Sequence, residues 1–130
     1  MKYIGIDFGL KRIGIAISDK EGKIAFPRDI IENKKDKIFK YLEQLILEEG
    51  VEYIILGLPK SLQGRDTEIT EKVQAFSKKL EENIDIPIVF ENEMLTTKIA
   101  KQSNIAKDKV DASSAALILQ AYLDRKNMLQ

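Results

Sequence analysis

The apolar residues of this chain form short runs near its N-terminus and helical stripes further along. Two runs, residues 2–7 and 12–18, are separated by a turn containing Gly9, and this pattern predicts two antiparallel strands. Residues 23–30 predict a third strand, which Pro27 restricts to an edge position or a short run. The beginning of the chain therefore predicts a three-stranded meander.

The amphipathic stripes that follow the meander predict helices. Apolar residues three and four positions apart mark a helix over residues 35–49, and Gly50 supplies its C-terminal stop. A second helix is expected after an N-cap at Asp66 or Thr67. Further helical patterns cover residues 96–103 and 111–125.

Two apolar runs between these helices complete the predicted sheet. The nearly continuous run 51–56 is typical of a strand buried on both faces, and residues 57–64 after it predict a loop. Residues 86–90 predict a further short strand. Right-handed crossovers place both parallel to the first strand. We therefore expect one α/β domain over residues 1–130, a mixed five-stranded sheet with helices on both faces. The ribonuclease-H-like fold has this order of elements.

Three acidic residues fall where such a fold gathers its functional side chains, at the carboxyl ends of parallel strands. Asp7 ends the first strand, Glu93 follows the last strand, and Asp111 begins the final helix. Each also fits an ordinary role, as a turn aspartate, a solvated acid or an N-cap, and Glu91 competes with Glu93. Three converging carboxylates repel one another unless a divalent cation lies among them, and their hard oxygens favour Mg²⁺ or Mn²⁺.

The composition narrows the chemistry further. The chain has no histidine and no cysteine, which excludes imidazole bases, histidine or thiolate metal sites and disulfides. Divalent cations held by carboxylates can activate water and stabilise the leaving oxygen of a phosphodiester, so the acids predict a nuclease. The lack of cysteine fits the cytoplasm, and no apolar run reaches the roughly 20 residues of a membrane helix.

The charged residues give a mixed indication about nucleic acid. The 21 basic and 21 acidic residues give a formal net charge of zero, which disfavours bulk electrostatic binding. Phe8 fits stacking on a base and equally fits packing in the core or the turn. Basic residues in loops can bind backbone phosphates or be ordinary solvated side chains; they are Lys11, Arg12, Lys60, Arg65, Lys107 and Lys109.

Four segments, in order along nearly the whole chain, resemble the YqgF family of RuvC-like nucleases. They are residues 4–19 (IGIDFGLKRIGIAISD), 57–64 (GLPKSLQG), 93–97 (EMLTT) and 109–120 (KVDASSAALILQ). The resemblance implies a ribonuclease-H-like fold, a cytoplasmic protein and a divalent-metal nuclease site on Asp7, Glu93 and Asp111. It also implies trimming of the 5′ end of pre-16S ribosomal RNA. Thr96, in the third segment, joins the candidate nucleic-acid contacts.

The resemblance leaves alternatives open. The family usually has Asp-Glu-Arg-Leu where this chain has Asn92-Glu-Met-Leu95; Asn92 is a poorer cation ligand than a carboxylate, and Met94 has no guanidinium to bind phosphate. Besides structured RNA, the same site suits branched DNA, as in a Holliday junction resolvase. A non-catalytic nucleic-acid-binding factor on this fold is the third interpretation. The sequence does not decide between a monomer and a homodimer, and it indicates no membrane partner.

Overall fold

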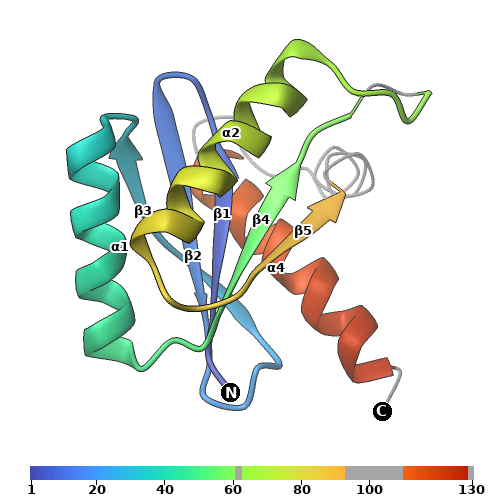
Figure 1. The fold of residues 1–130 in the computed structure, drawn as a ribbon. Coiled ribbons are helices and arrows are strands. Elements are labelled where there is room, and N and C mark those ends of the chain that lie inside the picture. Colours follow the sequence, from blue (N-terminus) through green and yellow to red (C-terminus); the bar gives the residue numbers. More distant parts are fainter. Residues whose placement is uncertain (61–62, 93–109, 129–130) are drawn as a thin grey trace.

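The computed structural model describes residues 1–60, 63–92 and 110–128, with the side chains of residues 110–113 left out. Its strands and helices follow the predicted order, from an N-terminal meander to alternating helices and strands (Figure 1). The elements are β1 (Tyr3–Phe8), β2 (Arg12–Ser18), β3 (Ala25–Glu32), α1 (Lys35–Glu49), β4 (Tyr53–Leu58), α2 (Glu68–Asn83), β5 (Ile88–Asn92) and α4 (Val110–Met128).

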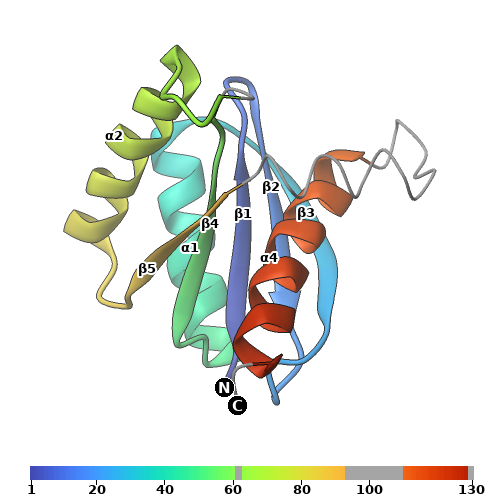
Figure 2. The ribbon, with the colours of Figure 1, turned by 90° about the vertical axis from the view of Figure 1, so that its right-hand side faces the viewer.

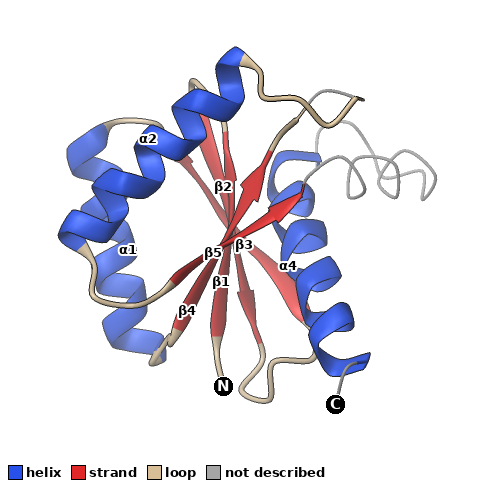
Figure 3. Ribbon diagram, turned by 45° about the vertical axis from the view of Figure 1, so that its right-hand side comes forward, coloured by secondary structure: helices blue, strands red, loops and turns tan. Residues whose placement is uncertain are grey.

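The strands form one mixed five-stranded sheet in the order β3-β2-β1-β4-β5. The strands of the meander pair antiparallel, whereas β4 lies parallel to β1 and β5 lies parallel to β4. Helices α1 and α2 cover one face of this sheet and α4 covers the other (Figure 3). The predicted fold class, a mixed five-stranded sheet between helices, is confirmed.

Alternating residues of β1 divide the core between the two faces of the sheet. Ile4 and Ile6 are fully buried with the apolar stripes of α1 and α2, whereas Tyr3 packs in a second cluster with α4 residues such as Leu119. The period of two along a strand therefore assigns each residue of β1 to one helical layer. No helix among the described residues is long and apolar enough to cross a bilayer.

Several element boundaries differ slightly from the predictions. The helix over 35–49 is confirmed, and Gly50 closes it in the left-handed conformation with φ of 65°. The third strand begins and ends two residues later than predicted, and Pro27 lies on the edge strand as expected. Thr67, rather than Asp66, caps α2, forming a capping box with Thr70. The helix predicted over 96–103 lies outside the described residues.

The loop predicted from Gly57 begins later than expected. Gly57 and Leu58 belong to β4, because β5 continues to pair beside them, with Gly57 opposite Glu91 and Leu58 opposite Asn92. A glycine inside a strand weakens it. Continued pairing with a neighbouring strand offsets that weakening.

Candidate functional site

Asp7 lies one residue before the end of β1, the central strand of the sheet. Its neighbour in β2 is Gly14, and its side chain is partly exposed. Tyr3 packs against α4, and alternation along the strand places Gly5 and Asp7 on that same face. Asp7 is therefore directed toward the α4 layer, at the edge where β1, β4 and β5 all end.

Gly5 allows α4 to pack unusually close to β1. A Cβ atom added at this position would lie 2.7 Å from Cβ of Leu119 and 2.9 Å from the carbonyl oxygen of Ala115. Any larger residue would push the helix away from the strand. The missing side chain at Gly5 thus sets the distance between the helix and the central strand.

The direction of α4 brings its first turn to the end of β1 that carries Asp7. Near the start of β1, the Tyr3 ring lies 5.8 Å from the ring of Tyr122, and Gly5 contacts Ala115 further along. The helix therefore runs back against the strand, and Figure 2 shows its N-terminal end beside the end of the sheet where β1 finishes. Asp111 is the second residue of α4, one helical turn before Ala115.

Several other predicted site residues lie outside the described residues. Glu93 comes directly after Asn92, the last residue of β5, and its own position is not described. The same holds for the predicted nucleic-acid contacts Thr96, Lys107 and Lys109. The roles predicted for these residues and for the side chain of Asp111 therefore stay predictions.

Glu91, the competitor of Glu93, has a structural role. Its carboxylate is 1% exposed and accepts hydrogen bonds from both terminal nitrogens of Arg125, with 2.5 Å between Nη1 and Oε1. This two-point ion pair connects β5 to the last turns of α4 and occupies both carboxylate oxygens. Glu91 is therefore unsuited to bind a cation with Asp7.

Lys11 and Arg12 are exposed beside the turn between β1 and β2, as the sequence predicted. Asn33, which the sequence did not identify, holds this turn in place: its Nδ2 donates to the carbonyl oxygen of Gly9 at 2.8 Å. The backbone N–H of Asn33 also donates to the carbonyl oxygen of Lys11 at 2.8 Å. The only signal for this role in the sequence is an asparagine, a residue that often bonds to backbone groups, in the loop between β3 and α1.

The loop after β4 carries the remaining basic candidates. Lys60 forms an ion pair with Asp66 at 3.5 Å, and Arg65 is exposed. Because Lys60 is partly exposed, water and salt weaken this pair, so a phosphate can compete for the ammonium group. Both residues lie in the loop that leaves the carboxyl end of β4.

The described side chains alone do not form a metal site. No three acidic side chains among those described gather closely enough to hold an ion. Asp7 nevertheless fits the predicted donor set, since it is a hard carboxylate ligand at the end of a rigid central strand. The residues that would complete the set are Glu93 and Asp111.

A mixed sheet in this order, with an acid near the end of its central strand, defines the class of ribonuclease-H-like proteins. The chain belongs to the RuvX family, whose model, described as Holliday junction resolvase, matches residues 1–125. The predicted family resemblance is thereby confirmed.

Relatives and solved structures agree with this assignment. A protein of Sulfurihydrogenibium sp., named "Putative pre-16S rRNA nuclease", is 37% identical, over 95% of this chain and 90% of its own. A protein of the same name from Maridesulfovibrio salexigens is 38% identical, over 96% and 99% of the two chains. The structure titled "T. thermophilus RuvC in complex with Holliday junction substrate" matches with a TM-score of 0.62 at 15% identity, covering 98% of this chain and 96% of that one. This last similarity establishes the fold.

Proposed function

We propose that this chain is a divalent-cation-dependent nuclease that hydrolyses phosphodiester bonds in the cytoplasm, trimming the 5′ end of pre-16S ribosomal RNA. The observation that carries the proposal is the placement of Asp7. It lies near the carboxyl end of the central strand, facing a helix whose first turn contains Asp111. Membership of the RuvX family and the shared name of the relatives support a hydrolase acting on nucleic acid.

In this proposal, each candidate residue has a defined task. Asp7, Glu93 and Asp111 hold Mg²⁺ or Mn²⁺, and Gly5 keeps α4 close enough to the central strand for two of these acids to share an ion. A divalent cation at such a site supplies activation of water and stabilisation of the leaving oxygen. This chemistry needs no imidazole, consistent with the absence of histidine.

The basic loop residues position the substrate rather than select its sequence. Lys11 and Arg12 stand at the turn next to Asp7, and Lys60 and Arg65 stand in the loop after β4. Contacts from such side chains to phosphates fix the register of a strand without reading bases. Thr96 and Lys109, in the segments flanking Glu93 and Asp111, are proposed to add contacts of the same kind.

The proposal is tested by replacing each acid with its neutral isostere. Purified Asp7→Asn, Glu93→Gln and Asp111→Asn are incubated with precursor RNA carrying its 5′ leader, in Mg²⁺ or Mn²⁺. We expect cleavage to fall by more than about 100-fold, because even groups that only orient metal ligands typically contribute 10- to 100-fold. Asp85→Asn is the matched control, since Asp85 is exposed and precedes β5 at the opposite end of the sheet.

Metal dependence is tested separately with EDTA, which should abolish cleavage in a way that Mg²⁺ or Mn²⁺ restores. Unchanged cleavage in Asp7→Asn and Asp111→Asn would refute the proposed site. Binding of the precursor without cleavage under any metal would instead favour a non-catalytic factor on this fold.

A second candidate substrate is branched DNA, favoured by the description of the family as Holliday junction resolvase. The same carboxylates would cut it, because the phosphodiester chemistry is shared. Side-by-side assays on precursor RNA and a four-way DNA junction distinguish the two substrates. Paired symmetric cuts in the junction would also require the chain to act as a dimer.

A further inference from the structure

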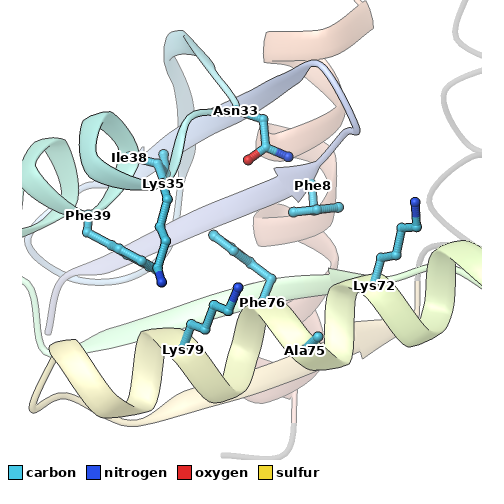
Figure 4. A pocket seen from close by; sticks show the side chains of 9 residues that line it. All are labelled: Phe8, Asn33, Lys35, Ile38, Phe39, Lys72, Ala75, Phe76 and Lys79. Atoms are coloured by element: carbon cyan, nitrogen blue, oxygen red, sulfur yellow. The ribbon is translucent and has the colours of Figure 1, made fainter.

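A pocket of about 330 Å³ lies between α1 and α2, on the face of the sheet opposite α4 (Figure 4). Its floor is apolar and aromatic. The rings of Phe8 and Phe76 lie 5.0 Å apart, and Phe39 stacks on Phe76 at 6.2 Å. Phe39 and Phe76 are largely buried, whereas Phe8 is partly exposed and offers its ring to an occupant.

The rim of this pocket is positively charged. Lys35 from α1 and Lys72 and Lys79 from α2 line it, and none of the lining residues is acidic. Figure 4 shows the side chains of Lys35 and Lys79 extending over the pocket from its two walls. The three lysines are exposed, and none forms an ion pair with another described residue.

The lysines on either side of Lys35 in the sequence differ from it, because they have an acidic partner. Lys34 and Lys37, beside Lys35 in sequence, both pair with Glu32, at 3.4 and 3.3 Å. The chain as a whole has a formal net charge of zero, so three unneutralised ammonium groups around one apolar pocket create a local anion-attracting surface. Charge complementarity therefore favours an anionic occupant that also has a flat apolar part.

We infer that this pocket, which we call the α1–α2 groove, binds a single-stranded nucleotide segment of the substrate, with a base against Phe8 and phosphates on the lysines. The inference rests on the proposed nuclease function. A basic groove with an aromatic floor is the general arrangement for binding single strands independently of sequence. The volume is within the range of small-molecule sites, so the pocket admits a single nucleotide unit.

The groove and the proposed catalytic site contain residues that are neighbours in the sequence. Phe8 follows Asp7 directly in β1, and alternation directs the two side chains to opposite faces of the sheet. Asn33 also lines the groove and holds the turn after β1 through Gly9. A strand that passes over the end of β1 can therefore contact Asp7 on one side and the groove on the other.

The experiment compares charge-matched pairs of substitutions on the same two helices. Lys35→Gln/Lys79→Gln removes two charges from the groove, and Lys40→Gln/Lys78→Gln removes two exposed charges outside it. Each protein binds a fluorescein-labelled 12-nucleotide oligouridylate at a series of salt concentrations. We expect the slope of log K against log[salt], which is negative, to become shallower by about 1.4 in the groove pair alone, because each phosphate contact on a single strand contributes about 0.7 to its magnitude.

A second pair of variants tests whether the anionic strand occupies the groove. Ala75 is exposed and lines the groove, so Ala75→Glu adds a bulky negative charge there. Gln74→Glu places the same charge on the preceding residue, which does not line the groove. We expect Ala75→Glu to weaken oligouridylate binding at least about 10-fold more than Gln74→Glu, because phosphate and carboxylate repel.

Equal slopes in the groove pair and its control would overturn the inference. So would equal binding by Ala75→Glu and Gln74→Glu. Binding of uridine monophosphate as tight as that of the 12-mer would also overturn it, since the occupant would then be a free nucleotide. If the groove variants bind the oligouridylate normally while Asp7→Asn still abolishes cleavage, the inference about the groove is refuted and the nuclease proposal stands. If groove-dependent binding persists in a protein that never cleaves, the nuclease proposal alone fails.

Discussion

Replacing Gly5 by alanine tests whether the close packing of α4 on β1 sets the geometry of the proposed site. The new Cβ would lie 2.7 Å from Cβ of Leu119 and 2.9 Å from the carbonyl oxygen of Ala115. Comfortable carbon contacts lie at about 3.5–4.0 Å, so α4 must retreat from the strand by about 1 Å. Overpacking of this size typically costs about 1–3 kcal/mol of unfolding free energy.

The functional loss should exceed what this destabilisation explains. A displacement of about 1 Å at a reacting geometry can cost about 100-fold in rate. Because Asp111 moves with α4 while Asp7 stays on β1, we expect Gly5→Ala to cleave precursor RNA about 100-fold more slowly. The assay is single-turnover cleavage at a temperature where circular dichroism shows the variant to be fully folded.

Val73→Ala provides the control for stability alone. Val73 is fully buried on α2, on the opposite face of the sheet from α4. Its truncation should lower the unfolding free energy by about 2 kcal/mol without moving α4. We expect this variant to cleave within a few-fold of the wild-type rate. If Gly5→Ala is destabilised but cleaves as fast as Val73→Ala, then the spacing of α4 and β1 does not control the site.

Three further predictions concern the stability of the fold. Arg125→Ala leaves the buried Glu91 without its partner and should lower the unfolding free energy measured in urea by about 3 kcal/mol. This value is the lower end of the range for breaking a buried ion pair, because Arg125 is 55% exposed. A loss below about 1 kcal/mol would contradict this. Thr67→Ala removes the N-cap of α2 and should cost about 1 kcal/mol in the same titration, whereas Thr67→Ser should cost little. The Lys2 ammonium, which donates to Glu49 at 2.5 Å, lowers the pKa of that carboxyl below 4.5. Glu49→Gln should therefore be less stable than wild type at pH 7, and the difference should disappear as the pH falls through the lowered folded-state pKa of Glu49; a constant difference would refute this.

The helices and strands were predictable because their signals are local. Apolar spacing and Gly50 placed the helix over 35–49, and the alternating runs placed the meander. One error was at Gly57, which the sequence assigned to a loop and the structure assigns to β4. Its strand conformation depends on pairing with Glu91 in β5, a partner 34 residues away that no local pattern reveals.

The candidate site was only partly predictable, for the same reason. Asp7 was identified from its place at a strand end, and that position is confirmed. Glu91 looked like an equivalent acid until the structure paired it with Arg125. The role of Gly5 had no signal at all, because a glycine in a strand does not indicate which helix crosses it.

By itself, the sequence determined the class of fold and the order of its elements through short-range periodicity, and the absence of imidazole chemistry through its composition. It indicated the family through the resemblance of four segments. Only the tertiary structure decided which acid is neutralised, how near α4 lies to β1 and where unpaired lysines surround the aromatic groove. Those features depend on contacts between residues far apart in the chain. Their energies are set by burial and distance, which exist only once the sheet and helices have packed.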